Sequence, residues 1–237
     1  MANGLNASKL PSTSNAKPIP PLDAGSYPAR LVQILLMGIQ KNRPYKGEEK
    51  APSLKIRLTY EMLDEFMKDD DDNDIPEKPR WISEDLPFFP LKADLAKSTK
   101  RYYALDADSE HGGDWSQLLS SPCMVTLVQS AGKDKIYNNV AAVSAMRPKE
   151  AAKAPPLVNE GKIFDFYSPD MDVFSSLPDW LQEETKNALD YAGSPLEAIL
   201  SKTAPDTKKK EVAGKQSPVK PSPEPKGNID DADAGDW

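Results

Sequence analysis

A strictly alternating stretch, LKIRLTYEML, restricts the possible folds of this chain more than any other part of its sequence. From Leu54 to Tyr60 every second residue is apolar, and the positions between them carry Lys55, Arg57 and Thr59. Successive side chains of a β-strand point to opposite faces, so this period of two predicts a strand that is buried on one face and solvated on the other. Such a strand requires a sheet and a hydrophobic core beside it.

Other segments supply the rest of that sheet. Before it, DAGSYPARLVQILLMGIQ predicts a long strand, and Gly38 near its end suggests a strand that bends and serves two sheets. After it, KPRWISEDLPFF predicts a third strand, and CMVTLVQ and IYNNVAAVSAM predict two more, joined by a hairpin turn at AGKDK. The run DDDDND predicts a solvated turn, because the glycine and glutamate of an EF-hand calcium loop are missing from it.

Helical patterns separate the third strand from the fourth. LKADLAKSTKRYYALD predicts a helix with Leu91 and Leu95 on its inner face and Arg101, among several lysines, on its outer face. A short helix at DWSQLLS follows it. The order strand, strand, strand, helix, strand, strand predicts a mainly β domain over residues 23–150, a five-stranded OB-fold-like Greek-key barrel with an inserted helix. The same order also fits an unrelated barrel.

The flanking segments differ from this domain in composition. Residues 1–22 are rich in Ser, Asn and Pro, and this composition predicts a disordered leader. Residues 151–202 predict a proline-rich segment that wraps over the barrel and then a helical extension. In it PDWLQEETKNALDYA is amphipathic with Trp180 available for packing, and Ser194 caps a further helical turn. Residues 203–237 predict a flexible basic linker with an acidic tip, because burial cannot offset their chain entropy.

The residue types present argue against the common kinds of catalytic and metal centre. The chain has 237 residues with one cysteine, Cys123, and one histidine, His111, whereas a structural zinc site needs about four such ligands. The sequence contains no P-loop, dinucleotide-binding glycine pattern or nucleophile elbow. It therefore predicts a protein that is not an enzyme and uses no metal or cofactor, although a nuclease built only from Asp, Glu and Lys remains an alternative.

Segments typical of export or membrane insertion are missing from the sequence. It has no signal-peptide pattern, no apolar run of membrane-spanning length and no pair of cysteines for an internal disulfide. Cys123 lies in the apolar run PCMVTLV and is expected to be buried, and His111 is expected in a surface loop. We therefore expect a soluble cytoplasmic protein.

Charge is unevenly distributed along the chain. The formal net charge is −7, yet residues 23–150 carry 18 basic and 21 acidic side chains, nine of the acids between Glu61 and Glu77. Without that segment the count is 17 basic against 12 acidic side chains. The predicted barrel thus has a mildly positive surface outside one loop, as contact with a phosphate backbone requires.

Basic and aromatic residues recur where an OB-fold binds its ligand. Proteins that hold single strands combine positive charge with aromatic side chains on which bases stack. The candidate DNA-binding residues are Arg43, Tyr45 and Lys46 in the first loop, Lys55 and Arg57 on the second strand, Arg80 and Trp81 on the third, and Lys133, Lys135 and Tyr137 at the last hairpin. The alternative is that Trp81 and Tyr137 pack in the core or at its rim, and that Lys55 and Arg57 belong to a plain solvated sheet face.

The chain ends in NIDDADAGDW, an acidic tip with a final aromatic residue after a linker. This arrangement resembles single-stranded DNA-binding proteins of bacteria and tailed bacteriophages, and the block DAGSYPARLVQILLMGIQK is similar to the start of phage proteins of this type. The resemblance implies a protein that coats single-stranded DNA during phage DNA replication, recombination and repair, in the host cytoplasm. The bacterial tip ends in Pro-Phe, whereas this one ends in Gly235-Asp236-Trp237, closer to phage versions.

The same resemblance implies a role for the tip. Its acidic residues would dock on partner replication and recombination proteins and could also occupy the DNA groove of the same chain, with the final aromatic as anchor. By position these residues are Asp230, Asp231, Asp233, Asp236 and Trp237. A possible homo-oligomer, the DNA site size and binding of RNA stay open. The alternative function is a non-enzymatic interaction adaptor or structural phage protein that uses residues 163–200 as its partner surface.

Overall fold

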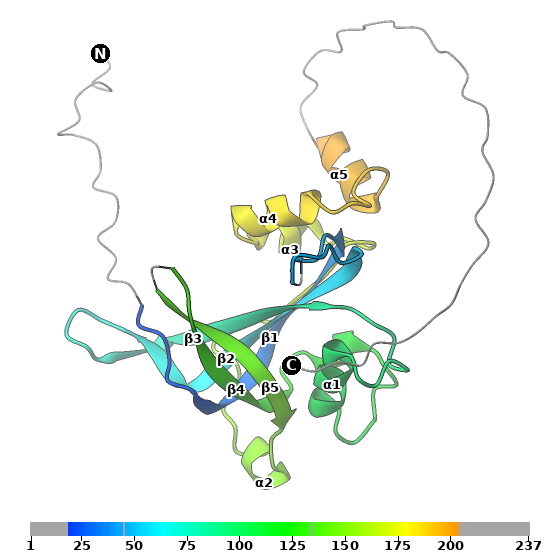
Figure 1. The fold of residues 1–237 in the computed structure, drawn as a ribbon. Coiled ribbons are helices and arrows are strands. Elements are labelled where there is room, and N and C mark those ends of the chain that lie inside the picture. The colour runs from blue at the N-terminus through cyan, green and yellow to red at the C-terminus, as the bar shows by residue number, and fades with distance from the viewer. Residues whose placement is uncertain (1–18, 45, 134, 204–237) are drawn as a thin grey trace, which may run out of the picture.

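The computed structural model describes residues 19–44, 46–133 and 135–203. Figure 1 shows a mainly β molecule with few helices, as the sequence predicts. It is built on one sheet of six strands rather than the five that the sequence predicts. Its elements are β1 (Gly25–Gln40), β2 (Ser53–Lys68), β3 (Asp74–Pro87), α1 (Lys97–Leu105), η2 (Trp115–Leu118), β4 (Pro122–Ala131), β5 (Ile136–Ala145), α2 (Pro148–Ala151), β6 (Lys162–Asp165), α3 (Met171–Ser176), α4 (Asp179–Lys186) and α5 (Pro195–Thr203).

β1 is the central strand of the sheet. The strand order is β3-β2-β1-β4-β5, with β6 also paired to β1. One edge of β1 pairs with β2 along residues 29–40, and the other edge pairs first with β4 and then, in parallel, with β6. The prediction that the first strand serves two sheets is therefore wrong, because both of its halves belong to one sheet and only its edge partner changes.

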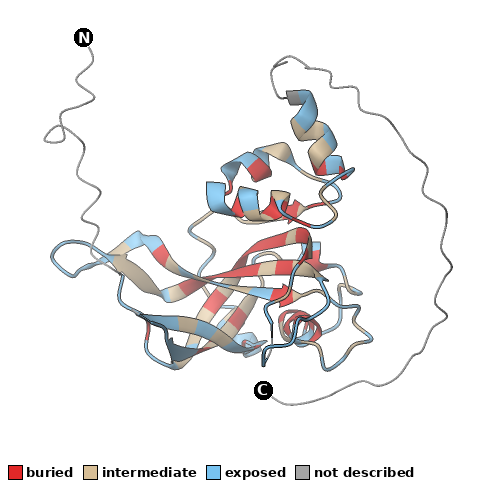
Figure 2. Ribbon diagram, turned by 45° about the horizontal axis from the view of Figure 1, so that its top comes forward, coloured by how far each residue is buried: buried red, intermediate tan, exposed pale blue. Residues whose placement is uncertain are grey.

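The first hydrophobic core lies against the sheet beside α1 and η2. On β2 the side chains of Ile56, Leu58 and Tyr60 are buried in it, as the alternation predicts, together with Tyr102 of α1. Figure 2 shows this buried region along β1 and β2 and in α1. The predicted helix begins later than its pattern suggested, at Lys97, so that Leu95 precedes it and is 65% exposed rather than on an inner face.

A second core fills the opposite side of the C-terminal half of β1. It contains Leu35 and Met37 of β1, Phe164 of β6 and apolar residues of α3, α4 and α5. Gly38 lies where this core meets the strand, with a φ of +72° and with Ala188 only 2.9 Å from the position of a Cβ. A side chain there would be strained and would collide with its neighbours. The glycine thus permits the close approach of the helical extension to β1.

The sheet remains open between its outer strands. β3 and β5 are in contact, but no ladder in the described chain joins them. Arg101 of α1 lies between them: its guanidinium donates to both carboxylate oxygens of Glu84 on β3, at 2.8 and 3.1 Å, and to the carbonyl of Ala141 on β5 at 3.3 Å. The prediction that Arg101 points outward is wrong, because its partner Glu84 lies at the core boundary and pairs with it there.

We call the boundary between β3 and β5 the seam. The protonation states of Arg101 and Tyr60 beside it follow from burial and from the ion pair with Glu84. Burial lowers the pKa of Arg101, but the hydrogen bond and the charge of Glu84 outweigh burial and leave that pKa above its ordinary value. Burial and the neighbouring Glu84 carboxylate raise the pKa of Tyr60 well above its usual range, and its hydroxyl donates to Glu84 at 2.9 Å. The seam is therefore closed by a neutral phenol and a charged pair rather than by strand pairing.

The segment that follows β5 crosses the outer face of the sheet, and sequence patterns did not predict its short elements α2, β6 and α3. Arg30 donates to the carbonyls of Ala154 and Pro155 at 2.9 and 2.6 Å. Glu61 of β2 accepts from the backbone N–H groups of Val158 and Asn159 at 2.6 and 3.3 Å. These contacts bury Glu61 on the strand face that alternation marks as solvated.

The remaining sequence predictions concern local features. Ser194 caps α5 as predicted, accepting from the N–H of Glu197 at 3.1 Å. The acidic run forms the turn between β2 and β3, where the Asp69 carboxylate accepts from the N–H groups of Asp71 and Asn73 at 2.9 Å each.

Over residues 19–203, setting aside positions 45 and 134, no helix has the length and apolarity needed to cross a bilayer. The predicted leader and tail lie almost wholly outside the described residues.

Candidate nucleic-acid interface

A groove of about 900 Å³ lies over the seam between β3 and β5. Its walls come from the loop that follows β1, from β2, β3 and β5, from Lys97 at the start of α1, and from α4. Its lining residues are Lys41, Asn42, Arg43, Lys55, Arg57, Ser83, Glu84, Asp85, Leu86, Pro87, Lys97, Tyr137, Asn138, Asn139, Val140, Trp180 and Glu184. Elements far apart in the sequence thus share one polar depression, which we call the seam groove.

A second groove, of about 490 Å³, adjoins the first. The two share Tyr137 and Asn138 of β5, so together they form a continuous track along the outer strands. We call the second one the hairpin groove, because the β4–β5 hairpin forms one of its walls. Its lining residues are Ile19, Pro21, Met67, Pro79, Arg80, Trp81, Ile82, Lys135, Ile136, Tyr137 and Asn138.

The structure brings most of the predicted site residues into these grooves. Those in the seam groove are Arg43, Lys55, Arg57 and Tyr137. Those in the hairpin groove are Arg80, Trp81, Lys135 and, again, Tyr137. Lys46 and Lys133 are exposed on the adjoining loops but line neither groove. The predicted residues Tyr45, Asp230, Asp231, Asp233, Asp236 and Trp237 lie outside the described residues.

Two of the seam-groove cations are paired with carboxylates. Arg57 of β2 donates to Asp85 of β3 at 2.8 Å, and the ammonium of Lys55 lies 3.2 Å from a carboxylate oxygen of Glu184 on α4. The third carboxylate of the groove, Glu84, forms an ion pair with Arg101 of α1, which does not itself line the groove. Since five basic residues line this groove, it retains a positive balance.

Three further cations of the seam groove have no such partner among the residues that the structure describes. Lys41, Arg43 and Lys97 are exposed, and none of the ion pairs within the described residues includes them. Lys41 and Lys97 were not predicted as site residues. The sequence gives only a weak signal for Lys97, as one of several lysines on the outer face of the predicted helix. Only the packing of α1 against the seam shows that this lysine faces the groove.

Aromatic side chains line both grooves and keep much of their surface exposed. Trp81 is 39% exposed, with its indole N–H donating to Glu61 at 3.0 Å, and Tyr137 is 47% exposed. The ammonium of Lys135 lies 4.9 Å from the centre of the Tyr137 ring. Neither ring is buried in a core, so the groove presents apolar faces beside cationic groups.

Neither the protein-family models nor the curated proteins contain a match to this chain.

Proposed function

We propose that this protein binds single-stranded DNA with little sequence preference along the track formed by the seam groove and the hairpin groove. The observation that carries the proposal is the convergence on one continuous depression of exposed aromatic rings and of cations that form no ion pair within the described residues. A positively charged channel with stacking platforms is what a single strand needs, because its phosphates and its bases are both accessible. Duplex DNA offers no exposed base faces for such rings.

The strand pairing supports an OB-fold-like interpretation of the sheet. β1 pairs with β2 and β4, β2 pairs with β3, and β4 pairs with β5, while α1 falls between β3 and β4. An OB-fold has this order and binds through strands 2 and 3 and the loops 1–2 and 4–5. Both grooves are lined from those regions, so the proposed site lies where that architecture places a ligand.

In this proposal Asp85 and Glu184 neutralise Arg57 and Lys55 until DNA arrives. Phosphate oxygens then replace Asp85 as the partner of Arg57 and Glu184 as the partner of Lys55. The three other cations of the seam groove bind further phosphates. Bases stack on Trp81 and Tyr137. Phosphate and ring contacts carry little base information, so the protein would coat DNA of many sequences.

We further propose that the acidic tip serves recruitment and competition, on the strength of its sequence alone. The linker is long and basic, and the tip imitates a short anionic strand with an aromatic end. It would occupy the groove when DNA is absent and become available to replication and recombination proteins when DNA displaces it. Removal of residues 230–237 should then tighten binding to DNA, and an unchanged affinity would refute the competition.

A salt titration of oligo-dT binding tests the proposal. We expect binding at low salt that weakens steeply as salt rises, because phosphate contacts release counterions. A variant that ends at Lys202 removes the competing tip and should bind at least as tightly as the whole chain. The proposal fails if neither protein binds oligo-dT at low salt.

That negative result would favour the alternative, an adaptor or structural protein that uses residues 163–200. In the structure, much of the apolar surface of these residues is already used in the second core, through Phe164, Phe166, Phe174, Leu177 and Leu181. The exposed apolar side chains that remain on this segment are few, and one of them, Trp180, lines the seam groove. We therefore favour DNA binding.

A further inference from the structure

We infer that α4 forms a wall of the DNA site and that Trp180 is a base-stacking residue of the seam groove. This inference rests on the proposed function and adds to it a residue and an element that the sequence did not assign to the site. Trp180 lines the groove together with Arg57 and with Tyr137 of β5. The C-terminal extension would then be part of the binding surface rather than a separate appendage.

The burial pattern of α4 separates Trp180 from the core-forming residues of the same helix. Leu181 and Thr185 are buried and hold the helix against the second core. Trp180 is 55% exposed, the most exposed of the aromatic side chains in the described chain that line a groove, and neither core of that part of the chain includes it. A large ring that contributes to no core has an apolar face left for a ligand.

Contacts with β1 and β2 fix α4 in this position. The side-chain amide of Gln40 donates to the carbonyls of Met37 and Glu184, each at 3.0 Å, and so joins the end of β1 to the end of α4. Beyond α4, the Asp190 carboxylate accepts from the N–H of Ile39 at 2.8 Å. The Trp180 ring is thus held on a rigid support, which reduces the entropy lost when a base stacks on it.

The geometry around Trp180 suits one nucleotide of a single strand. The guanidinium of Arg57 lies 4.9 Å from the centre of the Trp180 ring. A cation therefore stands next to an aromatic face, and a phosphate and its base could engage the two groups together. Lys55, two residues along the same strand face, pairs with Glu184 on the same helix, so α4 also controls a second cation.

A competing explanation is that Trp180 only packs on the Arg57 side chain and orients its charge. The two roles differ in their dependence on the base. A stacking residue contributes little when the ligand has phosphates but no bases, whereas an orienting residue contributes equally to both ligands.

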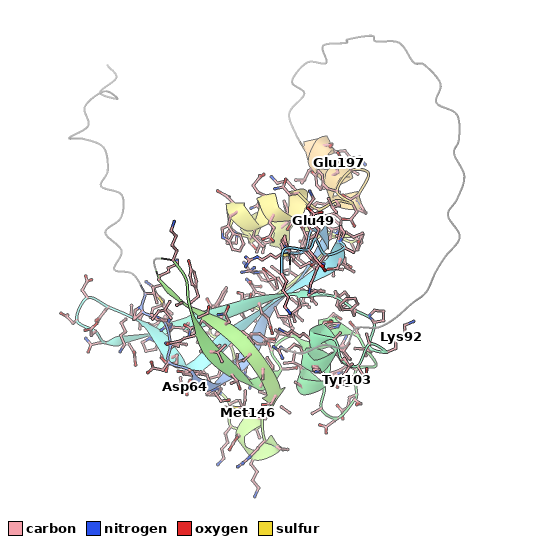
Figure 3. The ribbon with its side chains drawn as sticks, viewed as in Figure 1. Glu49, Asp64, Lys92, Tyr103, Met146 and Glu197 are labelled. Carbon is pink, nitrogen blue, oxygen red and sulfur yellow. The ribbon has the colours of Figure 1, made fainter. Side chains whose placement is uncertain are left out.

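The test compares oligo-dT with an abasic oligomer of equal length, in the whole chain and its variants, by fluorescence anisotropy at low salt. Trp180→Ala should weaken oligo-dT binding by about tenfold, within the range for loss of one stacked base, while Trp180→Phe retains most of the affinity. Tyr103→Ala is the matched control, because Tyr103 is a 48% exposed aromatic residue on α1 and lies away from α4 (Figure 3). It should bind like the unaltered chain.

The outcomes separate this inference from the proposed function. Equal binding of the abasic oligomer by the Trp180→Ala variant and the unaltered chain would support stacking. If the variant binds oligo-dT as tightly as the unaltered chain, or loses the same factor on both ligands, the inference is refuted while DNA binding stands. If the unaltered chain binds no oligo-dT at low salt, both the inference and the proposed function are refuted.

Discussion

Neutralising the three seam-groove cations that form no ion pair within the described residues should flatten the salt dependence of DNA binding. The change is Lys41→Gln, Arg43→Gln and Lys97→Gln together; all three side chains are exposed and line the groove. Each phosphate contact on a single strand contributes about 0.7 to the slope of log affinity against log salt. Removing three contacts should therefore reduce the slope by about 2.1.

The number of basic residues that line the seam groove sets the size of this change in salt dependence. If all five seam-groove cations contact phosphates, together they contribute about −3.5 to the slope, which is a fall in affinity of about 100-fold between 50 and 200 mM salt. With two of them left, their contribution is about −1.4 and the corresponding fall is about sevenfold. The difference between the slopes does not depend on whether Lys55 and Arg57 exchange their carboxylate partners for phosphates, because both proteins retain them.

The assay is the anisotropy of a labelled dT oligomer, titrated at several salt concentrations. A matched control neutralises three exposed lysines that line neither groove, Lys92, Lys149 and Lys153, and changes the net charge by the same amount. Lys92 lies on the α1 side of the molecule (Figure 3). Equal slopes for the groove variant and the unaltered chain, or an equal reduction in the control, would refute the assignment of these cations to the site.

Three further predictions concern stability. Gly38→Ala should lower the free energy of unfolding in urea by about 2 to 5 kcal/mol, from strain at positive φ and overpacking against the second core, and a loss below about 1 kcal/mol would contradict that packing. Arg101→Met should cost about 3 to 5 kcal/mol, because it leaves Glu84 charged and poorly solvated, and adding Glu84→Gln should recover part of the loss; an additive double variant would show that the two residues do not act as a pair. Burial raises the pKa of the Cys123 thiol from 9.0 to about 12, so the folded state keeps a proton that the unfolded state releases. The contribution of this thiol to stability should therefore be full below pH 9 and be lost as pH rises from 9 towards 12, and Cys123→Ala should remove that loss; an identical profile in the variant would contradict the assignment.

Features that depend on local periodicity could be predicted from the sequence. The first part of β2, over residues 54–63, follows from alternation, because burial of one strand face is already visible in the order of residues; its continuation to Lys68 does not. The capping of α5 by Ser194 follows from the type and position of one residue. The order of the five long strands and α1 could also be predicted, because each of these elements is long enough to show its own hydrophobic pattern.

Features that depend on distant partners could not be predicted. Arg101 looks like a solvated helix residue until Glu84, on another strand, is placed beside it. Glu61 looks like an exposed strand residue until the segment around Val158 crosses over it. β6 has only four residues, too few for a period to be distinguished from a loop.

The residues of the candidate site also fall into those that could be predicted from the sequence and those that could not. Basic and aromatic residues on the loops and strands of an OB-like order could be found from the sequence, and several of them, such as Arg57 and Tyr137, line the grooves. Trp180 could not be found in this way, because its position depends on the contact of Gln40 with the end of α4. An amphipathic helix shows which face is apolar, but it does not show which exposed ring will stand over a groove formed by other elements.

Photocrosslinking tests the central claim most directly, because it reports both whether a single strand binds and where it lies. A dT oligomer that carries 5-iodouracil at several positions is bound to the whole chain at low salt, irradiated and mapped by peptide mass spectrometry. We predict crosslinks in peptides that contain Trp81, Tyr137 or Trp180, the exposed rings that line the two grooves. The absence of any crosslink, or crosslinks confined to residues outside both grooves, would contradict the account.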